Sequence, residues 1–431
     1  MRSLSVYLNE LAIGVLAETG DVWSFEYDQM WAQSPHSFDL SPALSRHQLC
    51  HVDGASTRTV QWYFDNLLPE ETQRTRLGKE AGINGEDAFA LLQFLGAESA
   101  GSLVLLAPGA LPELTSAALP LAAADLSQRI RCLPSVSLSH GAPKRMSVAG
   151  AQNKLLVLFQ DGELFEPQGT LPSTHILKPE HDSEDYPNSV INEFAMMTLA
   201  GRVGLAVPPV TRLYVPEPVY IVERFDRRWT ANGKPQRSHI IDACQLLNKP
   251  RAYKYSAATM TALVECIALC ANKARARMQL FRWLVFNVLI GNDDIHLKNL
   301  SFSVTEAGVD ICAAYDLLST AVYHTRAYAD DRAMWPNLPL MIPLSSASTF
   351  NEVSRMSLME AALVLGLAKH TAERELQQIK RQLLSEFETL MSEVKAANQS
   401  NPAALGLQQA SDIRLLSAIR YIVLPDMLAK I

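Results

Sequence analysis

The nine residues "GNDDIHLKN" (291–299) place several polar side chains directly after the apolar run "FRWLVFNVLI" (281–290). Burying a carboxylate without a partner costs several kcal/mol, so we expect Asp293, Asp294 and Asn299 to face a cleft or one another. In the catalytic loop of kinases, an Asp accepts the proton of the attacking hydroxyl and an Asn five residues later binds magnesium. Asp294 and Asn299 have this spacing.

With His296 the loop reads Asp-x-His-x-x-Asn, which resembles the loops of phosphoinositide-type and aminoglycoside-type kinases.

Two other interpretations of these nine residues stay open. The stretch could be a polar loop that caps the preceding helix. It could also hold the divalent metal ion of a hydrolase, with Asp293, Asp294 and His296 as ligands.

A kinase also needs a second metal-binding carboxylate and a lysine that contacts the phosphates. Asp316 of "VDICAAYDLLST" (309–320) follows an apolar run and supplies the carboxylate. Leu-Leu follows it in place of Phe-Gly, so only the metal-binding role is expected. Lys178 of "THILKPE" occupies an internal strand position, where its ammonium needs a phosphate or a carboxylate partner. Glu193, on the next predicted helix, is the candidate carboxylate.

The elements before these residues are predicted from their periodicity. Apolar and polar residues alternate in "LSVYLN", "LAIGVLAE" and "VWSFEYD", which predicts a small antiparallel sheet. A helix is expected in "DAFALLQFLG", and a linker rich in Pro, Ser and Ala with a short helix inside it follows.

The second half of the chain changes from strands to helices. Asp161-Gly162 lies between two apolar runs and predicts a hairpin. An edge-like strand ending at Pro179, an amphipathic helix over 189–205 and a buried strand over 219–225 follow. Helical periodicity then dominates, and the longest helix carries one apolar face: Leu376, Ile379, Leu383, Phe387, Leu390 and Val394.

This order of elements is the layout of a bilobal nucleotide-binding enzyme. Together with the kinase-type residues above, it predicts an α+β, bilobal protein-kinase-like fold with a small β-rich N-terminal domain and a mostly helical C-terminal lobe. The expected ranges are 1–107 for the N-terminal domain, 108–140 for the linker, 141–228 for a region like a kinase N-lobe, and 229–431 for the helical lobe.

Composition and sequence patterns argue against several other classes of protein. A formal charge of -7 and a pI near 5.8 argue against a direct, sequence-independent grip on nucleic acid. The six cysteines contain no C-x-x-C pair, which favours reduced thiols over a disulfide scaffold or a zinc site. The sequence contains no signal-peptide pattern and no apolar stretch long enough for a membrane span. We therefore expect a cytoplasmic protein without membrane association.

Six ordered motifs resemble those of the HipA family, the serine/threonine kinase toxins of HipBA-type toxin–antitoxin modules. They are "SVAGAQNK" (147–154), "STHILKPE" (173–180), "NEFAMMTLAGRVGL" (from 192), "ERFDRR" (223–228), "GNDDIHLKN" and "YDLLST". The first hundred residues, including "VYLNELAIGVLAE" and "WYFDNLLPEETQRTRLGKEAGI", resemble the N-terminal domain of that family.

The resemblance implies a role for each matching residue. Asp294 would orient or deprotonate the substrate hydroxyl, and Asn299 and Asp316 would hold Mg2+ at the ATP phosphates. Lys178 would contact those phosphates, with Glu193 in support. The other implied ATP-binding residues are those of the phosphate-covering loop (Ser147, Val148, Ala149, Gly150, Ala151 and Gln152), the hinge residues Glu223 and Phe225, and His296 and Lys298. Ser147 is also the position at which family members autophosphorylate and switch themselves off.

The resemblance implies an ATP- and Mg2+-dependent kinase toxin that phosphorylates a cytoplasmic protein such as an aminoacyl-tRNA synthetase. Its expected partner is a small helix-turn-helix, HipB-like antitoxin, through which DNA is contacted mainly indirectly. Two rival functions are a small-molecule or lipid-type kinase and an inactive kinase-like binding module.

Overall fold

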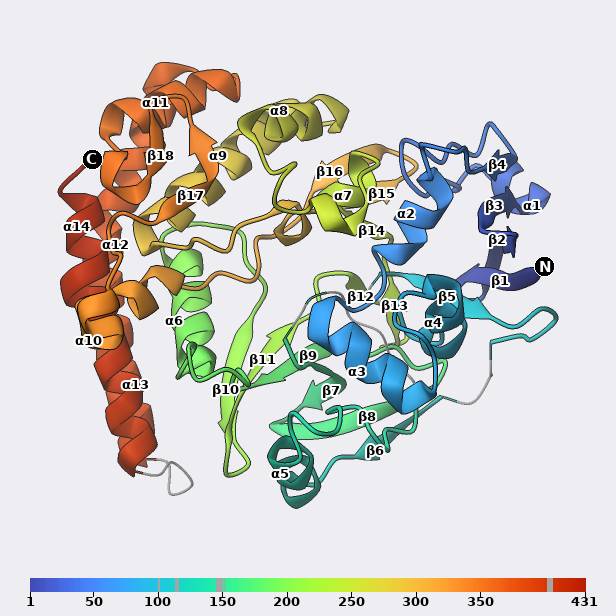
Figure 1. Cartoon of the computed structure of the whole chain (residues 1–431), viewed down its shortest axis with the longest axis horizontal. Coiled ribbons are helices and arrows are strands. Elements are labelled where there is room, and N and C mark those ends of the chain that lie inside the picture. Colours follow the sequence, from blue (N-terminus) through green and yellow to red (C-terminus); the bar gives the residue numbers. More distant parts are fainter. Residues whose placement is uncertain (100, 113–115, 145–149, 151, 401–405) are drawn as a thin grey trace. The chain divides into compact units, whose positions relative to one another are not determined.

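The computed structural model describes residues 1–99, 101–112, 116–144, 150, 152–400 and 406–431. The chain forms two compact units. Figure 1 labels their helices and strands. The first unit comprises Met1–Asp182, Ile221–Tyr253 and Phe302–Val309, and the second comprises Ser183–Tyr220, Lys254–Ser301 and Asp310–Ile431. The four ranges predicted from the sequence stay predictions, because each unit combines segments from several of them.

The first unit begins with a five-stranded sheet in the order β4-β3-β2-β1-β5. Its strands are β1 (Arg2–Leu8), β2 (Leu11–Thr19), β3 (Val22–Tyr27), β4 (Cys50–Val52) and β5 (Leu103–Leu106). The pairs β1–β2, β2–β3, β3–β4 and β1–β5 are antiparallel, as the alternating sequence predicts. The helices of this region are α1 (Gln29–Gln33), α2 (Thr59–Asp65), α3 (Glu71–Ala81) and α4 (Ala88–Leu95).

A second sheet of the first unit contains the predicted hairpin. Strands β7 (Leu155–Gln160) and β8 (Glu163–Gly169) pair in antiparallel fashion. The turn between them has positive φ at Asp161 (52°) and Gly162 (86°), as a tight hairpin turn requires. The predicted linker does contain a short helix, α5 (Ala123–Arg131), but it also contains β6 (Ser116–Pro120), which pairs with β8.

The strand that carries Lys178, β9 (His175–Pro179), is not an edge strand. It lies between β7 and β11 (Pro218–Glu223) in the sheet. Pro179 suggested an edge, but it is the last residue of β9 and follows the residues that pair with β7, so it removes no hydrogen bond from that ladder. The edge-strand prediction was therefore wrong.

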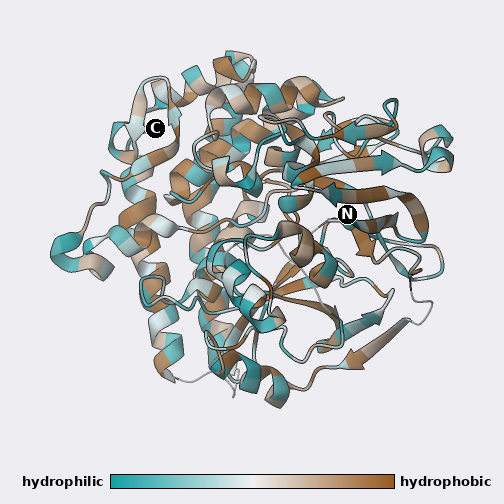
Figure 2. Ribbon diagram, turned by 45° about the vertical axis from the view of Figure 1, so that its right-hand side comes forward, coloured by the Kyte–Doolittle hydropathy of each residue, from teal (hydrophilic) through white to brown (hydrophobic). Residues whose placement is uncertain are grey.

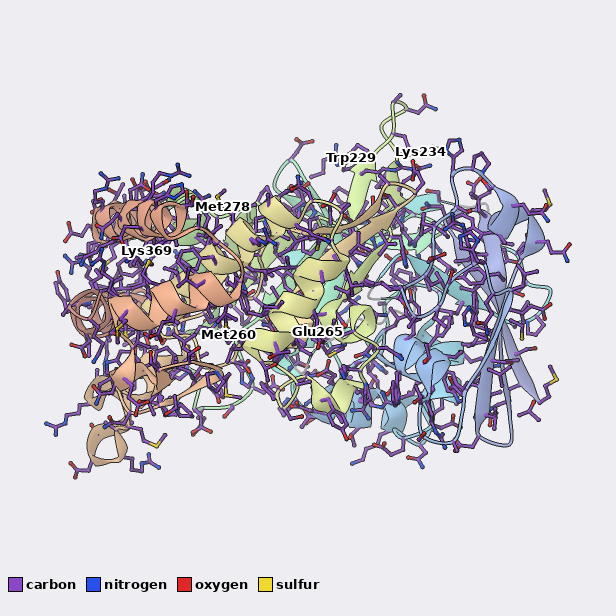
Figure 3. The ribbon with its side chains drawn as sticks, turned by 90° about the horizontal axis from the view of Figure 1, so that it is seen from above. Trp229, Lys234, Met260, Glu265, Met278 and Lys369 are labelled. Carbon is purple, nitrogen blue, oxygen red and sulfur yellow. The ribbon has the colours of Figure 1, made fainter. Side chains whose placement is uncertain are left out.

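Shorter elements complete the first unit. Strands β12 (Arg227–Trp229) and β13 (Pro235–Arg237) form a hairpin at which Figure 3 labels Trp229 and Lys234. The unit also holds β14 (Ile240–Asp242), α7 (Ala243–Leu246) and the 3-10 turn η1 (Arg251–Tyr253), and the chain re-enters it through β15 (Ser301–Thr305) and β16 (Gly308–Ile311).

The second unit is mainly helical, as predicted for the C-terminal region. Its longer helices are α6 (Ser189–Arg202), α8 (Met260–Leu269), α9 (Lys273–Ile290), α11 (Arg355–Val364), α12 (Lys369–Ser400) and α13 (Gly406–Ala418). Its other helical elements are the 3-10 turns η2 (Leu297–Asn299), η3 (Thr320–His324), η4 (Asp330–Arg332) and η5 (Phe350–Glu352), the short helices α10 (Arg326–Ala329) and α14 (Leu424–Leu428), and the π-helical η6 (Ile419–Val423). Its strands are β10 (Val210–Tyr214) and the hairpin β17 (Pro339–Leu344) and β18 (Ala347–Thr349).

Side-chain burial agrees with the predicted helical periodicity. All six residues of the predicted apolar face of α12 are buried. Figure 2 shows hydrophobic and hydrophilic residues alternating along the helices, as one-sided burial requires. No helix in the described ranges is both long and apolar enough to cross a membrane. The observed mixture of a β-rich N-terminal region and a helical C-terminal region confirms the predicted fold class.

Candidate active site

Helix α9 of the second unit ends at a glycine that turns the chain into the "NDDIHLKN" loop. Gly291 has φ 65°, and its N–H bonds the carbonyls of Asn287 and Val288. A Cβ atom at Gly291 would lie 2.8 Å from Ala321 Cβ and 3.0 Å from Val423 Cγ1. Both the backbone angle and the lack of space therefore require glycine here.

Two buried amides connect α9 to the loop. Asn287, fully buried in the apolar helix, donates to the carbonyl of Trp283 and accepts a hydrogen bond from Asn292 Nδ2 at 2.8 Å. Asn292 Oδ1 in turn accepts from the backbone N–H of Asp294 at 3.1 Å. This role of Asn287 was not predicted from the sequence, although an amide in a buried helix needs hydrogen-bond partners and is a detectable signal.

Asp294 is accessible to solvent at the middle of this loop. Its pKa is raised to about 6, mainly because the surrounding protein reduces the hydration of its carboxylate. A hydrogen bond from the Tyr255 hydroxyl to Oδ1 (2.6 Å) lowers the pKa, whereas the nearby carboxylate of Asp316 contributes to raising it. The carboxylate thus combines access with a pKa close to neutral, which suits a proton acceptor.

Asn299 and Asp316 are brought together, as their pattern predicted. Asn299 Nδ2 donates to Asp316 Oδ2 at 3.2 Å. Asn299 is 3% exposed, and its Oδ1 is buried without a hydrogen-bond partner among the described residues. Asp316 has φ 59°, an unfavourable angle for a residue with a side chain, and such angles persist mainly where the surrounding structure or a function demands them.

This pair fits a magnesium ion better than it fits a hydrolase site. Mg2+ usually takes one or two protein carboxylates and completes its shell with phosphate oxygens and water. Asp316 offers the carboxylate, and Asn299 Oδ1 offers an unused buried oxygen. Among the described residues, which include Asp293, Asp294 and His296, no three His, Cys, Asp or Glu side chains gather as a metal site would require.

Other predicted residues of the second unit lie near this pair. Glu193 of α6 is buried. Burial raises the pKa of Tyr220 well above its usual value, and the carboxylates of Glu193 and Asp316 raise it further, which places both acids near one phenol. Lys178 belongs to the first unit, so its pairing with Glu193 stays a prediction.

The two remaining predicted residues of the loop, His296 and Lys298, differ in their surroundings. The His296 ring packs edge-on against Tyr255, with ring centroids 4.9 Å apart. Lys298 is buried, and its carbonyl accepts a hydrogen bond from the Tyr315 hydroxyl at 2.6 Å. Both residues therefore have contacts that shape the loop.

The first unit holds the end of the predicted phosphate-covering loop next to the Lys178 strand. Gly150 has φ 110°, a conformation suited to glycine. Gln152 Nε2 donates to the carbonyl of Pro179 at 3.4 Å, beside the buried Lys178. The predicted loop residues Ser147, Val148, Ala149 and Ala151 lie outside the described residues.

Helix α3 fixes the residue that follows this loop. Asn153 Oδ1 accepts hydrogen bonds from Gln73 and Arg76, both at 2.7 Å, and Asn153 Nδ2 donates to Asp182 at 2.5 Å. The backbone N–H of Glu70 also donates to the carbonyl of Gly150 at 3.3 Å. These contacts were not predicted from the sequence, because they join residues 29 to 80 positions apart.

The predicted hinge residues follow β11. Glu223 is the last residue of that strand, and Glu223 and Phe225 are both half-buried. Between them, the backbone N–H of Arg224 donates to the carbonyl of Thr174 at 2.9 Å. The segment is therefore held beside the start of β9.

Comparisons with known proteins identify the family of the chain. The profile of the HipA N-terminal domain matches residues 4–106, and that of the HipA-like C-terminal domain matches residues 146–388. The chain belongs to the HipA family. It is 33% identical to the serine/threonine-protein kinase toxin HipA of Shewanella oneidensis over 74% of this chain and 76% of that protein. Its enzyme class is accordingly that of the serine/threonine-protein kinases.

Two further relatives cover most of the chain. The putative kinase Y4mE of Sinorhizobium fredii is 33% identical over 75% of this chain and 78% of that protein. A chain in the structure of the Shewanella oneidensis MR-1 toxin–antitoxin system HipA, HipB and its operator DNA complex superposes with a TM-score of 0.77 and 29% identity. That superposition covers 99% of both chains. The HipA-family assignment thus holds for both the N-terminal and the C-terminal regions.

Proposed function

We propose that this chain is an ATP-dependent serine/threonine kinase toxin of a type II toxin–antitoxin system. The observation that carries the proposal is the pairing of Asn299 with Asp316, because a buried amide oxygen without a partner beside a carboxylate suits a metal ion that accompanies a nucleotide. Asp294, accessible and close to neutral in pKa, lies in the same loop as Asn299.

Asp294 is the catalytic residue of the proposal. Its carboxylate accepts a hydrogen bond from the attacking serine or threonine hydroxyl and orients that oxygen. It takes the hydroxyl proton as the oxygen bonds the γ-phosphorus of ATP, while the bond between the γ-phosphorus and the bridging oxygen breaks and ADP leaves. A base with a pKa near 6 is ionised at neutral pH and still accepts a proton readily.

The other residues of the proposal bind the nucleotide. Asn299 and Asp316 would hold Mg2+, which neutralises developing phosphate charge when bound. Lys178, buried on β9, would contribute a positive charge to the phosphates, with Glu193 in support. Backbone groups at Glu223 and Phe225 would contact the adenine edge. His296 and Lys298 would contribute to the phosphate site, as would the loop residues Ser147, Val148, Ala149, Gly150, Ala151 and Gln152.

The same proposal includes partners and regulation. A HipB-like helix-turn-helix antitoxin would bind the chain and contact DNA, in line with the HipA, HipB and operator DNA complex of the Shewanella relative. The phosphorylated target would be a cytoplasmic protein such as an aminoacyl-tRNA synthetase. Autophosphorylation at Ser147 would add about two negative charges to a loop that must cover ATP phosphates, and repulsion would switch the enzyme off.

Label transfer from γ-labelled ATP tests the proposal. Asp316→Asn should reduce incorporation into protein at least about 100-fold, because it removes the metal-binding carboxylate. Asp310→Asn is the matched control, since Asp310 lies six residues upstream, outside the proposed site, and accepts a hydrogen bond from the backbone of Asn272. Phosphopeptide mapping of the wild-type protein should find Ser147 labelled. Equal transfer by Asp316→Asn and wild type would reject the metal site, and a wild-type protein that binds ATP without any transfer would reject the kinase function.

A further inference from the structure

Tyr255 makes a contact with Asp294 that the family resemblance does not assign. Its hydroxyl donates to Asp294 Oδ1 at 2.6 Å, a short bond of the kind expected for a phenol and a carboxylate. Tyr255 lies 39 residues before Asp294 in the chain, in the turn that precedes α8. Figure 3 labels Met260, the first residue of that helix. Because 39 residues separate Tyr255 from Asp294, the contact depends on tertiary structure and not on the loop itself.

The tyrosine ring is held on more than one side. It packs edge-on against the ring of His296, with an interplanar angle of 77°. The Lys254 ammonium lies 5.0 Å from the centre of the Tyr255 ring, a cation–π distance. Such contacts limit the rotation of the ring and keep its hydroxyl directed at the carboxylate.

The backbone beside Tyr255 is joined to the loop as well. The N–H of Leu297 donates to the carbonyl of Lys254 at 3.1 Å. Lys254 is 8% exposed, so this hydrogen bond forms in a largely buried place. Residues 254–255 thus brace the loop through backbone, ring and hydroxyl contacts together.

We propose that Tyr255 is a positioning residue that fixes the Asp294 carboxylate through Oδ1 and leaves Oδ2 to accept the proton of the attacking hydroxyl. The proposal rests on the proposed kinase function, since it assigns a task to the catalytic carboxylate. A carboxylate that already points at its substrate loses less entropy on reaching the reactive geometry. Tyr255 acts only through Asp294 and does not itself exchange a proton.

Tyr255→Phe removes the hydroxyl and keeps the ring that packs against His296. In the full-length protein, the rate of label transfer from γ-labelled ATP to the chain itself should fall about tenfold at saturating ATP, as expected for losing one hydrogen bond to a charged group. The ATP concentration at half-maximal rate should stay within about twofold, because Tyr255 lies outside the proposed nucleotide-binding residues. Tyr253→Phe is the matched control, because Tyr253 is 54% exposed on η1 and lies two residues away. It should behave like the wild type.

A second measurement separates this proposal from the kinase function. The NMR titration of the Asp294 carboxyl carbon, assigned by comparison with Asp294→Asn, should move up by about one pH unit in Tyr255→Phe, since the donor that stabilises the ionised form is gone. Both tyrosine variants keep the other groups that influence Asp294 or lie near it: Asp316, Lys254, Asp293 and Tyr186.

The outcomes are distinct. A slower Tyr255→Phe with unchanged ATP dependence and a raised Asp294 titration supports the proposal. A Tyr255→Phe that matches Tyr253→Phe in rate and in titration overturns it, as does a loss confined to ATP affinity. If the wild type transfers no label, the kinase function fails, and an unmoved Asp294 titration would then still refute the Tyr255 contact on its own.

Discussion

At the scale of single residues, Asp294 differs from an ordinary surface acid. It is open to solvent, yet the protein around it lowers its hydration, and Asp316 adds a like charge nearby. Both effects favour the protonated form, and the Tyr255 hydrogen bond opposes them. The balance gives a base that is ionised at neutral pH and protonated in mild acid.

This balance predicts the acid side of the pH–rate profile. The pKa of Asp294 is raised to about 6, so kcat/KM should fall about tenfold per pH unit below that value and should level off above it. Label-transfer rates measured at subsaturating ATP between about pH 5 and pH 8 check this. A profile that stays flat down to about pH 5 would show that no group of this pKa must be ionised.

The individual residues also show which parts of the candidate site could be predicted from the sequence. The Asp294–Asn299 spacing and the approach of Asp316 to Asn299 follow from local patterns, because the loop is short and is fixed by the end of α9. Tyr255 could not be found this way, since its contact depends on how the turn before α8 packs on the loop. Periodicity predicts which face of a helix is buried and says nothing about such long-range side-chain pairs.

At the scale of elements, the β12–β13 hairpin of the first unit is secured by a buried carboxylate, Glu98. Its oxygens accept hydrogen bonds from Lys144 Nζ at 2.8 Å, from Arg227 at 3.0 Å and from Arg237. Arg227 also bonds Asp226, which pairs with Arg224 at 2.7 Å. Burial alone would raise the pKa of Glu98, but Arg237, Lys144 and the neighbouring arginines hold it well below its usual range. Glu98 thus joins the segment after α4 to the strands that follow the predicted hinge.

Glu98→Gln should lower the free energy of unfolding by about 3–5 kcal/mol at pH 7, because it leaves several buried cations without their common partner. The pKa of Glu98 is lower in the folded protein than in the unfolded chain, where it is near 4.5. The ionised carboxylate therefore stabilises the fold fully above pH 4.5, and this stabilisation is lost as the pH falls through the folded-state pKa. The difference between the variant and the wild type should therefore shrink in acid. Urea unfolding at several pH values measures it, with Glu86→Gln as the control, since the Glu86 side chain is 81% exposed. A Glu98→Gln protein as stable as that control would contradict the account.

The individual helices and strands were predicted better than the pairing of strands within the sheets. The hairpin at Asp161-Gly162 and the buried face of α12 follow from turn chemistry and from helical period. The place of β9 inside its sheet did not follow, because strand order depends on pairing between segments far apart in sequence. For the same reason, the predicted linker gave no sign that β6 would add to that sheet.

At the scale of the whole molecule, the two compact units each contribute part of the predicted residue set. Lys178, Gln152, Glu223 and Phe225 belong to the first unit, and Glu193, Asp294, Asn299 and Asp316 belong to the second. Family profiles match on both sides of residues 107–145, and a relative of known structure covers 99% of the chain. The full chain is therefore the proper object for functional tests.

Two adjacent aspartates, Asp293 and Asp294, allow a direct test of whether Asp294 is the catalytic base. Asp293 and Asp294 share one loop, and changing either to Asn removes one negative charge at nearly the same place. Asp293 differs in its surroundings, since its carboxylate lies 4.0 Å from His324 Nε2 and its N–H bonds Thr320. The measurement is phosphate transfer from γ-labelled ATP by the full-length Asp294→Asn and Asp293→Asn proteins. We predict a loss of about 100-fold or more for Asp294→Asn and transfer within about fivefold of wild type for Asp293→Asn. Undiminished transfer by Asp294→Asn, or an equal loss in both proteins, would contradict the account.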